Sequence, residues 1–388
     1  MKNLNSILII LLFIVAGCGE NKQPAGDFIT VDVTAKYPQK KLILQDFMDV
    51  EYIPLETTDE FLCQGSLWAV GKDVIVASNF NTDGNIFIFD RKGKALRKIN
   101  RKGQGGEEYT TFSRIVLDEE NGEIFANDAY AKKILVYDLE GNFKRSLSIN
   151  KDFSLFEMYS FDQENLICRD AFNDYGMQAS HTGQSFMLIS KQDGSITEEI
   201  QIPFKEKKTI MIRIEDKEVS GKFYLYSPQT THPLMPYFND YILTEYSADT
   251  LYRYLPDHTL KPFIVRAPSI QSLNPEIFLL PSMLTDRYYF IAAVEKRMDF
   301  STTDIVYDKQ KKALFRFKVY NSDYTSEKQT FLSPRRPLNR EISSWQTLEA
   351  WELVKDYEKG VLKGRLKEIA ANLDPEDNPV IMLIKHKK

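Results

Sequence analysis

The stretch EIFANDAYAKKILVYDLEGNF, residues 123–143, decides the fold. Two runs rich in apolar and β-branched residues are separated by polar turn residues, which is the pattern of short antiparallel strands. Asn-Gly before the first run and Glu-Gly-Asn after the second are turn signals. Working outward from this stretch, the sequence predicts four strands, at residues 113–117, 123–127, 133–138 and 142–147.

The same unit recurs along the chain as an apolar strand, a polar residue and, in the clearest copies, a Gly-bearing turn. The copies lie at residues 86–93, 134–141, 186–194, 251–257 and 304–308. Their marker positions, 90, 138, 190, 254 and 308, are spaced by 48, 52, 64 and 54 residues. Four strands in a period of about 40–50 residues are typical of a β-propeller blade, which buries its faces only by stacking in a ring.

This period predicts an all-β fold, a six-bladed β-propeller over residues 28–388. Five blades follow from the repeat, and seven would need a longer chain. We expect both ends of the chain to close the sixth blade, from strand-like pieces at residues 28–33, 50–55 and 380–384.

A small C-terminal helical insertion is predicted at about residues 343–373. Ser343 and Ser344 are expected to cap a helix over 345–357 that ends at Gly360. A second helix is expected over 361–373, before Asp374-Pro375.

Parts of the second repeat resemble a known family. Ala126-Asn127-Asp128, then residues 133–138, then Gly141-Asn142-Phe143 are similar to an NHL-type propeller repeat. Residues 103–109, GQGGEEY, resemble the Gly-rich connection between such blades. With the N-terminal pattern described next, the chain resembles the six-bladed β-propeller lipoproteins of Bacteroidota. The resemblance implies a fold and a cell-envelope address, but no chemistry, because the function of that family is largely uncharacterised.

The N-terminus predicts an exported lipoprotein. Residues 1–17 read as a signal peptide, because their apolar run is too short to cross a bilayer of about 30 Å as a helix. Val15-Ala16-Gly17-Cys18 resembles a bacterial lipobox, which implies cleavage before Cys18 and its acylation. Two or more acyl chains anchor a protein stably to a membrane. Residues 18–27 are expected to form a tether between this anchor and the propeller. Gly19 in place of Asp favours the outer membrane by the family's rule, and the periplasmic and surface-exposed orientations both stay open.

Charge and cysteine content narrow the class of protein further. The 388 residues carry a net charge of −5, which argues against non-specific nucleic-acid binding. Besides Cys18, the chain has Cys63 and Cys168, both in apolar surroundings. Two buried thiols are the preferred interpretation, and a disulfide between them in an exported chain is the alternative.

No catalytic or cofactor-binding motif with the required spacing is present, so no cofactor is predicted. One segment, residues 79–90, is similar to a calcium-binding loop, since oxygen-bearing side chains stand at every second position before Gly84. Its candidate ligands are Asn79, Asn81, Asp83 and Asp90. A polar turn between two strands is the favoured interpretation of this segment.

Propeller geometry selects candidate ligand-binding residues. The inter-blade linkers and the loops between second and third strands gather at one face of the ring, beside its central funnel. The residues selected are Arg101, Lys102, Gln104 and Tyr109 from a linker, Asn127, Asp128 and Tyr130 from the second blade, and Arg169 and Asp170 from the third. Cationic, aromatic and amide groups together suit a sugar or a peptide. The alternative is that Asn127 and Asp128 hold their turn.

Two functions of different class follow. The favoured one is a lipid-anchored cell-envelope propeller that acts as a non-catalytic binding or assembly module, with a glycan, a peptide or an envelope protein as its partner. The alternative is a glycoside hydrolase or lyase with carboxylates from separate blades, held about 5–10 Å apart. No spacing in the sequence selects such a pair, so no catalytic residue is assigned.

Overall fold

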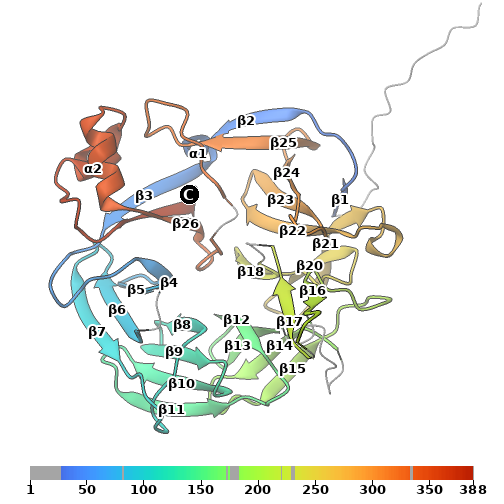
Figure 1. Cartoon of the computed structure of the whole chain (residues 1–388), viewed down its shortest axis with the longest axis horizontal. Helices are drawn as coiled ribbons and strands as arrows, with labels where there is room; N and C mark the ends of the chain where they lie inside the picture. Colours follow the sequence, from blue (N-terminus) through green and yellow to red (C-terminus); the bar gives the residue numbers. More distant parts are fainter. Residues whose placement is uncertain are drawn as a thin grey trace, which may run out of the picture.

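The apolar strands of the repeat fold into sheets arranged radially around an axis (Figure 1). The computed structural model describes residues 28–80, 83–171, 174, 183–219, 221–228, 232–332 and 335–387. Six sheets of three to five strands form the ring. The protein is therefore a six-bladed β-propeller, as the sequence predicts.

The first three blades each contain four antiparallel strands in chain order. The first blade is β4 (Ser66–Val70), β5 (Val74–Ser78), β6 (Asn85–Asp90) and β7 (Ala95–Asn100). The second is β8 (Arg114–Asp118), β9 (Glu123–Asp128), β10 (Lys133–Asp138) and β11 (Phe143–Ser148). The third is β12 (Leu155–Ser160), β13 (Asn165–Asp170), β14 (Phe186–Ser190) and β15 (Ile196–Ile200).

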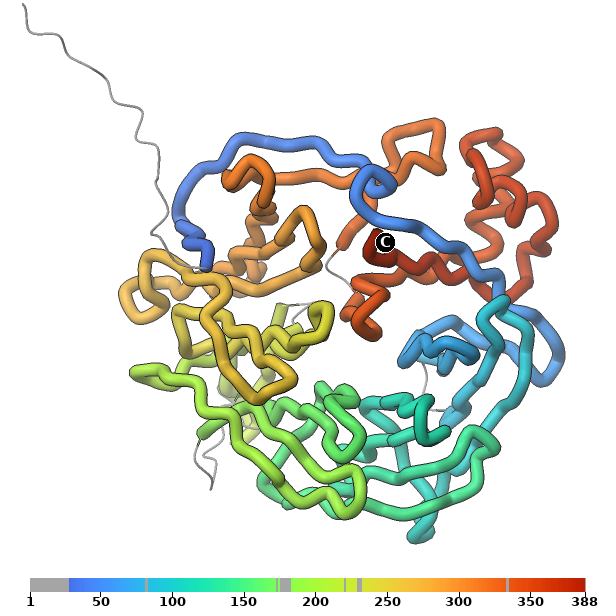
Figure 2. The backbone as a smooth tube through the Cα atoms, turned by 180° about the vertical axis from the view of Figure 1, so that it is seen from behind, coloured from blue at the N-terminus to red at the C-terminus, as the bar shows by residue number. Residues whose placement is uncertain are grey.

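The fourth and fifth blades each gain a fifth strand from the N-terminal part of the chain. The fourth is β18 (Leu234–Tyr237), β19 (Asp240–Leu243), β20 (Thr250–Tyr254) and β21 (Leu260–Ala267), with β1 (Ile29–Asp32) parallel to β21. The fifth is β22 (Ile277–Leu284), β23 (Tyr288–Glu295), β24 (Thr302–Asp308) and β25 (Ala313–Tyr320), with β2 (Gln39–Ile43) parallel to β25. The blue N-terminal segment thus runs along the outside of two blades (Figure 2).

The closing blade joins both ends of the chain. Strand β27 (Val380–His386) lies between β26 (Ile342–Leu348) and β3 (Met48–Pro54) and is antiparallel to both. The expectation that residues 28–33 belong to this blade is wrong. Their strand, β1, instead covers the backbone edge of β21, which would otherwise be left unpaired.

The helical insertion is shorter than predicted. Helices α2 (Ala350–Glu358) and α3 (Gly364–Ala370) follow β26, and α1 (Leu44–Phe47) is a single turn between β2 and β3. The helix predicted from Trp345 begins only at Ala350, because Trp345 is buried in β26 and pairs with Leu383 of β27. Among the described residues, no helix is both long and apolar enough to cross a membrane.

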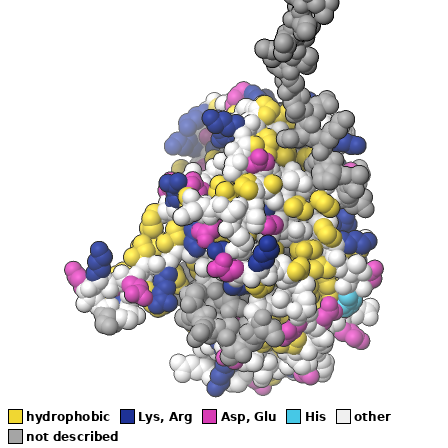
Figure 3. Space-filling model, turned by 90° about the vertical axis from the view of Figure 1, so that its right-hand side faces the viewer, with side chains coloured by type: hydrophobic (Ala, Val, Ile, Leu, Met, Phe, Trp, Pro, Cys, Tyr) yellow, Lys and Arg dark blue, Asp and Glu magenta, His cyan; other side chains and the backbone are white. Residues whose placement is uncertain are grey.

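A hairpin explains the longest interval in the repeat, the 64 residues between markers 190 and 254. Strands β16 (Ile212–Glu215) and β17 (Phe223–Tyr226) form their own two-stranded sheet between the third and fourth blades. Figure 3 shows this side of the ring, where positive and negative side chains are interspersed. This face therefore presents no broad field of one sign.

The core lies in wedges between neighbouring blades. One apolar cluster joins Val76 and Ile88 of the first blade to Ile115 and Ala126 of the second. Corresponding clusters fill the other five boundaries around the ring. No blade buries both faces alone, so each depends on its two neighbours.

Glycines in the turns between third and fourth strands let successive blades approach closely. A Cβ added at Gly93 would lie 2.0 Å from the Pro54 carbonyl oxygen at the end of β3. One at Gly141 would lie 3.0 Å from the Ile99 side chain of β7, and one at Gly194 3.0 Å from Leu147 of β11. The Gly-bearing turn of the repeat is therefore also an inter-blade contact.

Replacing Gly93 by Ala should destabilise the protein more than replacing Gly122 by Ala. Both glycines have positive φ angles, 86° and 62°, but a Cβ on Gly122 would meet nothing within 4 Å. Both variants then carry backbone strain of about 1–2 kcal/mol, and only G93A adds overpacking of about 1–3 kcal/mol. Urea unfolding measures the difference, and equal losses would contradict the close inter-blade contact.

Candidate functional site

A pocket of about 420 Å³ lies on the axis, where the first strands of several blades turn into the second. Four blades and the connection before β26 line this axial pocket. Its lining includes Trp68, Lys72, Arg114, Glu119, Tyr159, Tyr241, Asn339, Arg340 and Glu341. Its volume falls in the range of small-molecule sites, about 300–1,000 Å³.

The connection from β25 to β26 forms one wall of the axial pocket. It doubles back beside β26, since the Leu338 amide donates to the Ile342 carbonyl at 3.1 Å. The Tyr159 hydroxyl donates to the Pro337 carbonyl at 3.1 Å, and the Asn339 side chain donates to the Val70 carbonyl at 2.6 Å. The connection is thereby held against the first and third blades.

Arg114 is the most deeply buried cation of the axial pocket. Its side chain is almost fully buried, its Nε donates to the Met158 carbonyl at 3.0 Å, and its guanidinium lies 4.6 Å from the centre of the Tyr159 ring. Its Nη1 has no hydrogen-bond partner within the described part of the chain.

Arg336 stands nearby on the Trp68 ring, at 4.8 Å from its centre. Its Nε also has no hydrogen-bond partner among the residues described. Burial and the positive charge of Arg114 lower the pKa of Arg336 to about 9, so the two guanidiniums destabilise each other.

Glu157 is the carboxylate that faces these arginines. Burial raises its pKa to about 7, against the opposing influence of Arg169, Arg114 and Arg336. The Leu234 amide donates to its Oε2 at 3.0 Å. Arg169, the strand partner of Glu157, also forms a buried ion pair with Asp174. Three arginines, Arg114, Arg169 and Arg336, therefore stand near two carboxylates, which leaves an excess of positive charge.

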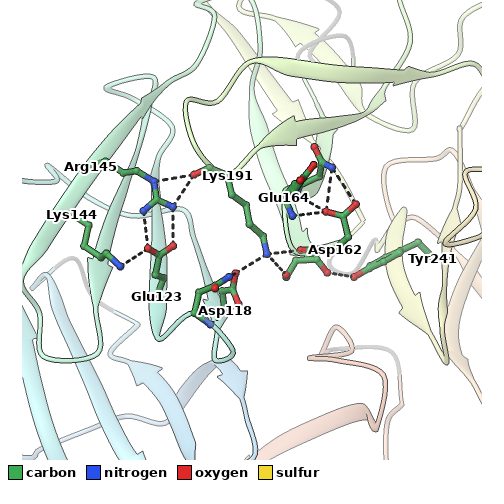
Figure 4. A network of polar contacts seen from close by, with 11 residues as sticks. Asp118, Glu123, Lys144, Arg145, Asp162, Glu164, Lys191 and Tyr241 are labelled. Atoms are coloured by element: carbon green, nitrogen blue, oxygen red, sulfur yellow. Dashed lines mark hydrogen bonds and ion pairs between the residues drawn. The ribbon is translucent and has the colours of Figure 1, made fainter.

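A polar network beside the pocket fixes the second, third and fourth blades to one another (Figure 4). Buried Lys191 binds Asp118 at 2.7 Å, the Ser160 hydroxyl at 2.9 Å and the Asp162 carbonyl at 2.6 Å. The Tyr241 hydroxyl donates to the Ser160 carbonyl at 2.6 Å, which adds the fourth blade. Ser160 and Tyr241 line the pocket, so this network also holds its shape.

None of the residues predicted to bind ligand is among those that line the axial pocket, but two of them pair with residues of the site. Asn127, near the end of β9, pairs in register with Arg114, and Arg169, near the end of β13, pairs in register with Glu157. The structure leaves Arg101, Lys102, Gln104 and Tyr130 exposed and buries Tyr109, Asn127, Asp128, Arg169 and Asp170.

The buried members of the predicted set have internal partners. Tyr109 donates to the Gly84 carbonyl at 2.7 Å, and Asp128 accepts from the amide and hydroxyl of Thr110, both at 2.7 Å. The linker continues into a second hollow of about 270 Å³, lined by Thr111, Phe112 and Phe80 and also by Trp68. Trp68 therefore borders both hollows.

The arginines near the axial pocket were not predicted as functional residues from the sequence. The available signal was Arg335-Arg336-Pro337-Leu338-Asn339-Arg340, three arginines in six residues of a long connection. Arg114 carried no signal of its own, because it stands at the start of an ordinary strand.

The calcium candidates are not gathered at one point. The Asn79 side-chain amide donates to Asp83 at 2.7 Å, but Asp90 lies at the other end of β6, where it accepts from the Lys92 and Lys94 amides. Asn81 is outside the described residues. The described chain holds no group of three or more potential metal-binding side chains. Cys63 and Cys168 are buried free thiols in different apolar clusters.

A six-bladed propeller with an aromatic and cationic pocket on its axis is the class that this fold and site define. The chain belongs to the family described as "Domain of unknown function (DUF4934)", whose model matches residues 28–385. This membership agrees with the uncharacterised propeller family that the sequence resembles.

Among solved structures, the chain is similar to a putative exported protein of Bacteroides fragilis. The two share 16% identity with a TM-score of 0.57, over 90% of this chain and 99% of that chain. A member of the DUF4221 family from Bacteroides vulgatus shares 9% identity with a TM-score of 0.45, over 87% of this chain and 96% of that chain. The first likeness concerns the propeller fold. A comparison with curated proteins gives no match.

Proposed function

We infer that this protein is a lipid-anchored propeller of the cell envelope that binds a glycan in the axial pocket without cleaving it. The observation that carries this proposal is the lining of the pocket. The partly exposed ring of Trp68 stands with the buried rings of Tyr159 and Tyr241, and Arg114 and Asn339 add hydrogen-bond donors, in a hollow of about 420 Å³. Such a combination suits a ligand with apolar ring faces and polar edges.

Two carboxylates near the pocket, Glu119 and Glu157, are engaged in ways that favour binding over hydrolysis. Glycoside hydrolysis generally uses one carboxyl group as an acid and a second as a base or nucleophile, across one bound sugar. Glu119 instead accepts hydrogen bonds from the amides of Lys72, at 2.6 Å, and Asp73, at 2.8 Å. Glu157 lies near three arginines, whose positive charges stabilise its ionised form.

The anchor in this proposal is an acylated Cys18, which lies outside the described residues. The Bacteroides fragilis neighbour is named a putative exported protein, which supports an envelope address for this chain. Residues 18–27 then serve as a tether between the outer membrane and the blades.

A glycan and peptide array tests the ligand and the site together. We expect the soluble chain from Asn21 onward to bind a set of glycans, and Trp68→Ala to weaken that binding about tenfold or more, the equivalent of losing one buried aromatic contact. Tyr130→Ala is the control, because Tyr130 is 82% exposed at the other end of the ring.

Three outcomes of the array would contradict the proposal. Release of shorter oligosaccharides would make the protein a hydrolase or lyase. Binding of peptides alone would replace the ligand class. Loss of binding in Tyr130→Ala with retention in Trp68→Ala would move the site to the opposite face.

Replacing Cys18 by Ala should release the protein from the membrane fraction. Without acylation the chain has no lipid to hold it in the membrane. Even one acyl chain gives only marginal membrane binding, so a chain with none should be released. Fractionation of cells that express each form, followed by immunoblotting, measures the change. Retention of the C18A form in the outer membrane would rule out this anchor.

A further inference from the structure

We propose that the glycan bound in the axial pocket is acidic, and that its anionic group, a carboxylate or a sulfate ester, binds to Arg114 and Arg336. This inference rests on the proposed function and adds a chemical class to its ligand. The residues that carry it were not part of the predicted patch.

Positive charge is in excess near the axis. Arg114 and Arg336 are close enough for the charge of one to lower the pKa of the other, and Glu157 is the carboxylate opposite them. Burying a charge without a counter-charge costs folding free energy, so a buried charge of this kind points to a binding partner of opposite charge. An anionic ligand is a partner that would offset the repulsion between the two guanidiniums.

Both arginines also have a hydrogen-bond donor that is not used within the described chain. Arg114 Nη1 and Arg336 Nε are buried atoms that have no hydrogen-bond partner in the part of the chain that is described. Arg91 and Arg169 also have one such nitrogen each, but each forms an ion pair, with Glu51 and Asp174 respectively. Guanidinium groups match the planar geometry of carboxylate and the tetrahedral oxygens of sulfate.

Access to the pocket distinguishes Arg114 and Arg336 from Arg266, the arginine with the most nitrogens that lack a hydrogen-bond partner in the described chain. Arg266 also has buried nitrogens without hydrogen-bond partners in the described chain, but the cavity beside it measures about 10 Å³. That volume is about one water molecule. Arg114 lines the axial pocket itself, and Arg336 stacks on Trp68, which also lines it.

The rest of the pocket favours an acidic glycan over an acidic peptide. Its lining includes side chains of both charges, positive Lys72 and Arg340 and negative Glu119 and Glu341. Carboxylates at the rim accept hydrogen bonds from sugar hydroxyls and repel the extra charges of an acidic peptide. The inner end is cationic, so a ligand with hydroxyls along its length and one anionic group fits this distribution.

Glu157 gives the proposal a distinctive signature. Its carboxylate attracts the same guanidiniums that the ligand would bind, and therefore competes with the ligand's anionic group. Neutralising it as Glu157→Gln should strengthen anion binding severalfold. A residue with only a structural role would not produce a gain.

The test is calorimetric titration of the soluble chain from Asn21 onward, at constant ionic strength. The probes are a uronic-acid oligosaccharide, a sulfated oligosaccharide, a neutral oligosaccharide of equal length, an acidic peptide and sodium sulfate. The first two probes distinguish carboxylate from sulfate ester as the anionic group.

Arg336→Gln and Arg114→Gln should weaken binding of the acidic oligosaccharides about tenfold or more, as expected for loss of a charged hydrogen bond. Arg297→Gln is the matched control and should change affinity by less than about threefold, because Arg297 is 59% exposed and is not among the residues that line the pocket. The thermal midpoint of unliganded Arg336→Gln should equal or exceed that of the unmodified chain, because the substitution removes a repelled cation. A lower midpoint would indicate a structural role for Arg336 and count against the proposal.

Unchanged affinity of Arg336→Gln for an acidic oligosaccharide would overturn the inference. Equal binding of neutral and acidic oligosaccharides would overturn it too, while leaving the proposed glycan-binding function intact. Binding of sulfate ion or acidic peptide alone, lost in Arg336→Gln, would support the anion site and overturn the glycan as its ligand.

Discussion

The ring depends on the pairing of β27 with β3, because that ladder joins the last strand of the chain to an early one. A sheet leaves two unpaired edges, and a circle of blades stays open unless its ends are linked. The seven residues Met48–Pro54 pair in register with Val380–His386, so neither end of the ring is free to separate. Strands β1 and β2 extend this closure by covering the outer edges of two further blades.

The candidate site follows from how the closing blade is built. Its strands come from both ends of the chain, and the connection before β26 passes along the axis rather than around the rim. This places Arg336 on Trp68 of the first blade and near Arg114 of the second. The excess of positive charge near the axis is thus a product of the closure, and no single blade contains it.

The repeat made most of the fold predictable, because a strand of four apolar residues with a Gly-bearing turn forms the same structure in each copy. Strands β6, β10 and β14 lie where the motif places them. The predicted helix over Trp345 was wrong, since pairing with β27 outweighs local helix signals. Residues 28–33 were given to the wrong blade, because strand partners are set by the assembled ring and not by the strand itself.

The axial pocket was less predictable than the fold. Propeller geometry selected Asn127 and Arg169, which the structure buries as the strand partners of Arg114 and Glu157. The site instead combines Arg114, Tyr159 and Arg336, whose proximity depends on long-range packing of three separate blades. Their sequence positions carry no common spacing, so only the folded ring brings them together.

Hydrogen–deuterium exchange followed by mass spectrometry tests the closure most directly. If β3 and β27 pair, peptides covering residues 48–54 and 380–386 will exchange as slowly as those of β9 and lose protection in the same unfolding step. Fast exchange in either peptide, while the second blade stays protected, would show that the chain ends are unpaired and would contradict this account of the ring.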